Sequence, residues 1–160
     1  MASTVKQRVA AVLLTLSAGG LALISSHEGR EYKAYRDPTG TWTICDGHTR
    51  GVKAGDTAND RICDALLRED SAQAQAAVKR LVKVPITQEQ YNALTDFVFN
   101  KGEGNFASST LLRKINANDC WGAGAEFPKW NKSKGVVLRG LIRRAADNRS
   151  QWESGCDPRP

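Results

Sequence analysis

The sequence lacks the residue patterns of a metal centre. Its 160 residues contain only two histidines and four cysteines, and no two cysteines form a C-x-x-C pair. Zinc sites usually need such closely spaced ligands, so we expect neither a metal nor a cofactor. Helix-turn-helix, zinc-finger and RNA-binding signatures are also missing, so the net charge of +6 does not indicate a nucleic-acid partner. It fits a polyanionic partner such as anionic lipid or a cell envelope.

Internal repeats and low-complexity linkers are missing too, and the length suits one domain or two small lobes that share a core. Near the N-terminus the apolar pattern predicts a helix that ends near Gly29 or Arg30. A turn signal at Asp37-Pro38-Thr39-Gly40 and a strand over 41–45 follow it. These elements predict a small β lobe.

The rest of the chain has helical periodicity. It predicts one long helix over 58–82, and a capping box that starts at Thr87 begins a helix that Gly102 ends. Further helices are expected at 108–116, 119–126, 136–144 and 146–153. The predicted fold class is α+β and mostly helical, with a small N-terminal β lobe and a long helix that links it to a helical C-terminal lobe.

The four cysteines fit two disulfides in an oxidising compartment, and three connectivities are possible. Cys45–Cys63 and Cys120–Cys156 are favoured, because each of these pairs joins segments of one predicted lobe. The other connectivities remain open, as do free buried thiols in a reducing compartment.

An uncharged segment runs from Val9 to Ser26, directly after Lys6 and Arg8. A basic start followed by an apolar run is typical of a signal peptide or an amino-terminal anchor. The run is about the minimum length for spanning a bilayer. Small and polar residues dilute it: Thr15, Ser17, Gly19, Gly20, Ser25 and Ser26. A signal cut after Ala22, a permanent anchor and an ordinary core helix are alternatives, but a reversible anchor fits both the charge pattern and the dilution.

Glu28, Asp37 and Thr43 are the candidate catalytic residues, because the turn-rich segment between them can bring all three to one cleft. Glycoside hydrolysis needs two carboxyl groups in different environments. One stays protonated to donate a proton, and the other stays ionised to activate water.

The pattern Glu-x8-Asp-x5-Thr within residues 27–49 resembles the phage-type lysozymes, the muramidase family used as endolysins. The likeness covers nearly everything from about residue 21 to 153 and includes 55–57, 90–100, 109–116, 126–131 and 140–144. The resemblance implies a lysozyme-like fold. It implies that Glu28 is the general acid, kept protonated by burial against apolar groups. Asp37 would activate water, and Thr43 would hold that water with its hydroxyl.

The resemblance also implies residues around this pair. Asn100 and Thr110 match cleft positions and would contact saccharide. Arg143 would lie at the substrate site and pair with Glu28, with Arg144 as the register-shifted alternative.

A structural pair is implied as well, in which His48 contacts an acid on the long helix, and Asp70 is the match here. Many relatives carry glycine where this chain has Cys45. A disulfide at Cys45 would therefore brace the catalytic strand or distort it.

These observations predict a phage endolysin that hydrolyses the β-1,4 bond between N-acetylmuramic acid and N-acetylglucosamine in peptidoglycan and acts as a monomer. Residues 1–26 would be a signal-arrest-release anchor that continues into the catalytic helix, and residues 27–160 the catalytic domain. The chain would sit in the host inner membrane facing the periplasm and then be released into the periplasm. A lytic transglycosylase and an inactive membrane-tethered peptidoglycan-binding protein are the alternatives.

Overall fold

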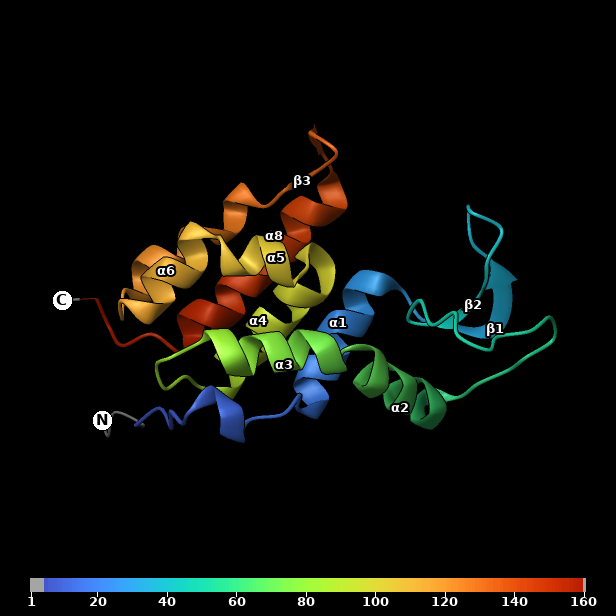
Figure 1. Cartoon of the computed structure of the whole chain (residues 1–160), viewed down its shortest axis with the longest axis horizontal. Helices are drawn as coiled ribbons and strands as arrows, with labels where there is room; N and C mark the ends of the chain where they lie inside the picture. The colour runs from blue at the N-terminus through green and yellow to red at the C-terminus, as the bar shows by residue number, and fades with distance from the viewer. Residues whose placement is uncertain (1–4, 160) are drawn as a thin grey trace.

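The computed structural model describes residues 5–159 and consists of a large helical lobe with a small β lobe at one end (Figure 1). Helix α1 (Ala18–Glu28) leads out of the helical lobe, and helix α2 (Asp60–Asp70) leads back toward it. The α+β architecture predicted from the sequence is confirmed.

The β lobe is an antiparallel hairpin of strand β1 (Glu31–Arg36) and strand β2 (Trp42–Cys45). Its turn follows Asp37, whose carbonyl oxygen accepts from the Gly40 amide at 2.8 Å. Gly40 adopts a φ of +85°, a conformation that costs glycine little. The hairpin therefore forms where the sequence places its turn signal.

The prediction of one long helix over 58–82 is wrong, because the structure has two helices there, α2 and α3 (Ala72–Leu81). The break lies at Ser71, which is fully buried and has a ψ of −2°. Its hydroxyl donates to the Arg68 carbonyl oxygen at 3.2 Å. Such a bond back to the chain competes with the helical ladder, so the two lobes are linked by two helices rather than by one.

Helix α4 (Gln88–Lys101) is the centre of the helical lobe and packs against α1, α3 and α8 (Arg139–Ser154). The capping box expected at its start is present, with Thr87 and Gln90 bonded to each other's backbone amides. Three short helices complete the lobe: α5 (Glu103–Ala107), α6 (Thr110–Asn116) and α7 (Cys120–Gly124). Phe97 of α4 makes edge contacts with Phe106 and Phe127 in the core.

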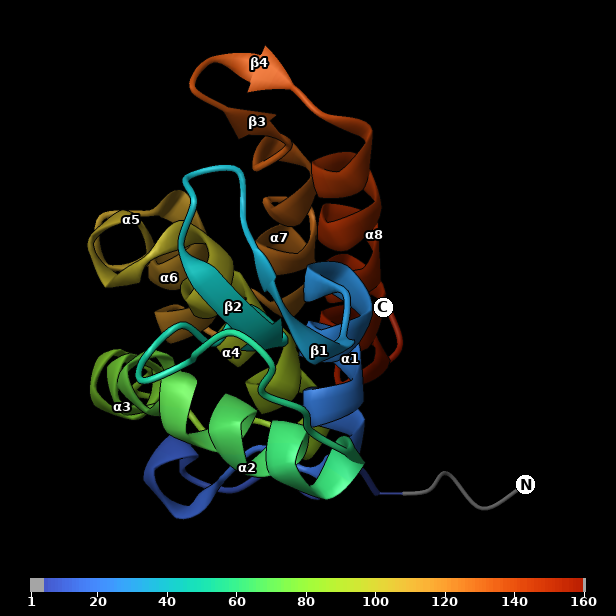
Figure 2. The same cartoon turned by 90° about the vertical axis from the view of Figure 1, so that its right-hand side faces the viewer.

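The prediction of two separate helices at 136–144 and 146–153 is also wrong. Residues 139–154 form the single helix α8, and a hairpin of β3 (Lys132–Ser133) and β4 (Val136–Val137) precedes it. Lys134 and Gly135 both have positive φ, at 48° and 79°, as tight hairpin turns require. Figure 2 shows this hairpin projecting beyond the helical lobe.

The uncharged N-terminal segment lies along the helical lobe. Val9 and Ile86 exchange two backbone hydrogen bonds of 2.9 Å, and a 3-10 turn, η1 (Ala11–Leu13), follows. Arg8 Nη2 lies 2.9 Å from an Asp157 carboxylate oxygen, so the segments around residues 8 and 157 lie side by side at one end of the helical lobe (Figure 1). Among residues 5–159, no helix has the length and apolar character needed to cross a bilayer.

Candidate active site

Glu28 is the last residue of α1, at the junction of the two lobes. The helix ends there because Gly29 adopts a φ of +81°. Leu21 and Ile24, on the buried face of α1, pack with Leu16 and Leu67. These contacts fix the helix, and so they fix the position of the carboxyl group at its end.

The Glu28 carboxyl group is held by Arg144 of α8, whose Nη1 donates to Glu28 Oε1 at 2.7 Å. The pairing expected with Arg143 is wrong, and the register-shifted alternative, Arg144, is confirmed. Arg143 lies on the exposed side of α8, whereas Arg144 is buried against α4. The burial against apolar groups expected for Glu28 is wrong as well, because Glu28 is exposed at the end of α1 and its side chain is 27% exposed.

Asp37 is held by the turn that it begins. Its Oδ1 accepts from the Thr39 hydroxyl at 2.6 Å and from the amides of Thr39 and Thr41 at 2.8 and 2.9 Å. The Thr39 hydroxyl and then the Thr41 amide lower the pKa of Asp37 below its ordinary value. This carboxyl group is therefore ionised at neutral pH, as the water-activating role requires.

Thr43 lies on β2 opposite Tyr35 and is 3% exposed. Its hydroxyl donates to the Thr41 carbonyl oxygen at 3.0 Å. The oxygen of that hydroxyl keeps lone pairs that can accept from a water molecule. Its predicted role in holding water stays a prediction.

Behind Glu28 lies a set of charged side chains, of which the sequence indicated only Arg144. Asp96 of α4 is fully buried and accepts from Arg144 Nε at 3.0 Å and from Arg144 Nη2 at 2.8 Å. His27, the residue before Glu28, lies between Asp96 and Asp147 at 3.3 and 2.8 Å. Asp96 lies on α4, and Arg144 and Asp147 lie on α8, so all three are far in sequence from Glu28. A helical-wheel comparison of α1, α4 and α8 is the signal that would have pointed to them.

The charge state of His27 makes stability depend on pH. Burial opposes a charged imidazole, but the hydrogen bonds to Asp96 and Asp147 outweigh it and raise the pKa of His27 above 6.5. A raised pKa in the folded state stabilises the fold fully below the unfolded value of about 6.5. This contribution is lost as the pH rises through the folded-state value.

We therefore expect His27→Gln to destabilise the protein more at pH 5.5 than at pH 9. Urea unfolding of both proteins at the two pH values measures the difference. Equal destabilisation at both values would show that His27 contributes no ion pair.

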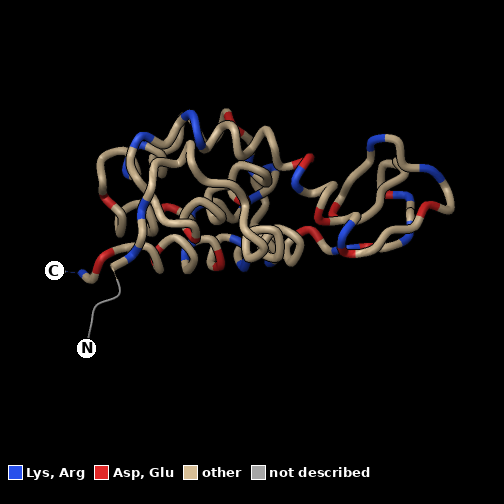
Figure 3. The backbone as a smooth tube through the Cα atoms, turned by 90° about the horizontal axis from the view of Figure 1, so that it is seen from below, with Lys and Arg blue, Asp and Glu red and all other residues tan. Residues whose placement is uncertain are grey.

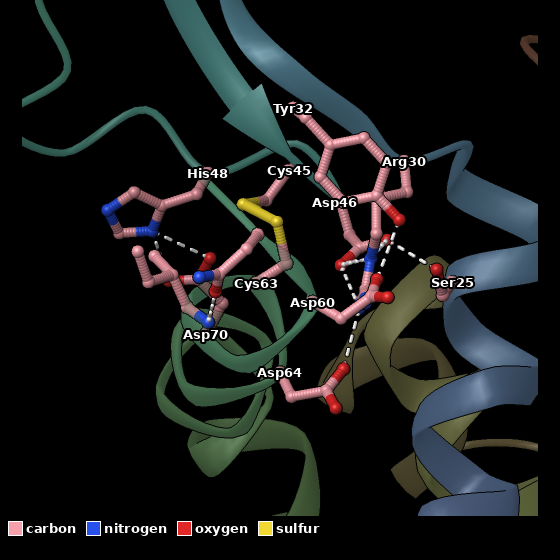
Figure 4. Close-up of polar contacts among 12 residues, drawn as sticks. Ser25, Arg30, Tyr32, Cys45, Asp46, His48, Asp60, Cys63, Asp64 and Asp70 are labelled. Atoms are coloured by element: carbon pink, nitrogen blue, oxygen red, sulfur yellow. Dashed lines mark hydrogen bonds and ion pairs between the residues drawn. A yellow bond between two sulfur atoms is a disulfide. The ribbon is translucent and has the colours of Figure 1, made fainter. Parts of the chain in front are cut away.

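The β hairpin is tied to α1 and α2 by an arginine at the start of β1 (Figure 4). Arg30 Nη2 donates to Asp46 at 2.8 Å and to Asp64 at 2.9 Å, and Arg30 Nη1 donates to Asp60 at 3.1 Å. Ser25 of α1 donates to Asp46 at 2.6 Å. The strand that carries Thr43 is thus fixed relative to the helix that carries Glu28.

Both disulfides favoured by the sequence are present. Cys45–Cys63 joins β2 to α2, and Cys120–Cys156 joins α7 to the segment that follows α8. His48 Nδ1 also lies 2.9 Å from Asp70 Oδ2, the pair that the sequence expects between the hairpin and α2. The β lobe therefore has a covalent tie and a side-chain hydrogen bond to the same helix.

The remaining predicted residues lie in the helical lobe. Asn100 is exposed near the end of α4 and lines a narrow recess with Arg144 and Trp130. Thr110 is exposed at the first turn of α6. Their predicted contact with saccharide stays a prediction. Lysines and arginines occur in both lobes (Figure 3), and residues 127–146 contain six of them and no aspartate or glutamate.

Comparisons with known proteins agree on one family. Residues 25–148 match the family model described as phage lysozyme. The endolysin of Acyrthosiphon pisum secondary endosymbiont phage 1 is 43% identical over 143 residues, which cover 87% of this chain and 98% of that protein. The SAR-endolysin of Enterobacteria phage P21 is 38% identical over 137 residues, 85% of this chain and 81% of that protein. The crystal structure of a P22 lysozyme mutant has a TM-score of 0.81 and 33% identity, covering 88% of this chain and 99% of that one.

Proposed function

The chain belongs to the phage lysozyme family, and we propose on this premise that it is an endolysin that hydrolyses the β-1,4 bond between N-acetylmuramic acid and N-acetylglucosamine in peptidoglycan. The observation that carries this proposal is that two carboxyl groups have different hydrogen-bond partners. Glu28 contacts a single guanidinium group at the end of a helix, whereas Asp37 accepts three hydrogen bonds in a turn. Two carboxyl groups in unlike environments can divide the acid and base roles.

Glu28 acts as the general acid. Its proton passes to the glycosidic oxygen as the bond from that oxygen to the anomeric carbon breaks, and positive charge develops on the sugar. Arg144 restrains the carboxyl group at the lobe junction, so its oxygens stay directed by a buried partner rather than by solvent.

Asp37 acts on the other side of the bond. Its ionised carboxylate takes a proton from water as that water attacks the anomeric carbon, and Thr43 holds the water with its hydroxyl. A lytic transglycosylase needs no residue in the role of Asp37. The hydrogen bonds that favour ionised Asp37 therefore favour hydrolysis.

We infer that the N-terminal segment regulates the enzyme. Residues 9–26 first lie in the inner membrane and then leave it, which releases the protein into the periplasm. Relatives named SAR-endolysin support this, as does the dilution of the segment by six small or polar residues. While the segment lies in lipid, Glu28 is held at the bilayer interface, away from Arg144. Packing of Leu21 and Ile24 against the helical lobe then brings the carboxyl group to its partner.

Added apolar side chains should hold the chain in the membrane. Thr15 and Gly19 are exposed, and a Cβ at Gly19 meets only the Ser17 hydroxyl oxygen at 3.6 Å. We expect the double variant Thr15→Leu/Gly19→Leu to stay in the membrane fraction after collapse of the membrane potential, while the unchanged chain moves to the periplasm. Cell fractionation with immunoblotting measures both.

The control is Thr15→Ser/Gly19→Ala, which changes the same positions without large apolar groups and should be released like the unchanged chain. Retention of the unchanged chain in the membrane fraction after collapse would contradict the proposed release.

A further inference from the structure

A continuous line of charged groups runs through the helical lobe and ends at Glu28. It begins at Asp147, which lies 2.8 Å from His27 Nε2, and His27 Nδ1 lies 3.3 Å from Asp96. Asp96 accepts two hydrogen bonds from Arg144, and Arg144 donates to Glu28 at 2.7 Å. The side chains of His27, Asp96 and Arg144 are 3%, 0% and 7% exposed.

The order of charges in this line matters for an acid catalyst. A lone guanidinium group 2.7 Å from Glu28 would favour the carboxylate and oppose the proton that catalysis needs. Arg144, however, directs two of its N–H groups to Asp96 and only one to Glu28. Asp96 thus neutralises part of the positive charge that faces the acid.

We propose that Asp96 and His27 are positioning residues for the glycosidase reaction: Asp96 offsets the positive charge that Arg144 presents to Glu28, and His27, which also contacts Asp96, weakens that offset. This inference rests on the proposed function. His27 and Asp96 do not touch the substrate in this account. They act through Arg144, so a charge change at either position should move the pH–rate profile of the reaction.

The groups that face this line come from three helices. Asp96 on α4 and Asp147 and Arg144 on α8 surround His27 of α1. Lys101 near the end of α4 adds a further positive charge, which is repelled by Arg144. Burial lowers the pKa of His27, but the hydrogen bonds to Asp96 and Asp147 raise it above its ordinary value. The charged imidazole then competes with Arg144 for the Asp96 carboxylate.

The two positions carry opposite charges, and their variants should therefore act in opposite directions. Asp96→Asn leaves Arg144 unbalanced, so the alkaline limb of the pH–rate profile should move about 1 pH unit toward acid. At pH 7 kcat should fall about tenfold with little change in KM. His27→Gln removes a positive charge, so the same limb should move toward alkaline pH by about half a unit.

The experiment measures kcat and KM from pH 4 to pH 9 on solubilised peptidoglycan at constant ionic strength. Arg139→Gln, at the exposed start of α8, is the control for loss of one positive charge and should leave the limb in place. His27→Gln replaces a buried imidazole with a neutral polar side chain, so it tests the proposal even where Asp96→Asn does not fold.

Opposite shifts support the proposal, as does an alkaline shift in His27→Gln alone where Asp96→Asn does not fold. Shifts of both variants in one direction, or a limb that His27→Gln leaves in place, overturn it. If the protein without substitutions has no muramidase activity, the proposed function is overturned instead. Failure of the proposal and failure of the proposed function are therefore distinguishable.

Discussion

Replacing Glu28 by glutamine should lower kcat for peptidoglycan hydrolysis by about 10³-fold, because glutamine cannot donate a proton to the glycosidic oxygen. KM should change little. Glutamine has the shape of glutamate, and its carbonyl oxygen can still accept from Arg144. Turbidity loss of purified sacculi, together with release of reducing ends from soluble fragments, measures the effect.

The matched control is Glu31→Gln, which changes an exposed carboxyl group three residues further along the chain. It should keep full activity, and both variants should unfold at nearly the same temperature as the unchanged protein. A Glu28→Gln enzyme that keeps more than a tenth of the activity would show that another residue supplies the proton.

Loss of the Cys45–Cys63 disulfide should have the second largest effect. The two cysteines are 18 residues apart, and opening such a loop should lower the free energy of unfolding by about 3 kcal/mol. The strand that ends at Cys45 also carries Thr43, so loss of the disulfide should displace Thr43 from its position in the site as well as lower stability. We expect the double variant Cys45→Ala/Cys63→Ala to lose about tenfold or more in kcat at 20 °C.

Cys120→Ala/Cys156→Ala is the control, since it opens a loop of 36 residues at the far end of the helical lobe. It should cost about 3–4 kcal/mol but leave kcat of the folded protein unchanged. Urea unfolding and initial rates at 20 °C separate the two effects. Equal kcat values in both double variants would show that the disulfide in the β lobe stabilises the fold without positioning the site.

The sequence predicts those parts of the fold that depend on neighbours along the chain. The Thr87 capping box, the turn after Asp37 and the helix end at Gly29 all form as predicted, since each depends on a few consecutive residues. The break at Ser71 depends on burial and on one side-chain bond to Arg68, which apolar periodicity does not reveal. Helix α8 continues through Ala145, where periodicity alone gave no reason to join two segments.

The same difference between residues close in sequence and residues far apart applies to the site. Glu28, Asp37 and Thr43 lie within 16 consecutive residues, and their pattern is readable in the sequence. Choosing Arg144 over Arg143 required the rotation of α8, because neighbouring residues on a helix differ in direction by about 100°. His27 and Asp96 are 69 residues apart, and no local pattern connects them.

The 116 residues that separate Glu28 from Arg144 also affect how the site is completed during synthesis. A ribosome that has translated the first 140 codons has already made Glu28, Asp37 and Thr43, but not the guanidinium group that holds the acid. Prematurely terminated chains therefore carry the reactive carboxyl groups without their buried partner. The acid is thus held by Arg144 only in nearly full-length chains, so the geometry of the site depends on complete translation.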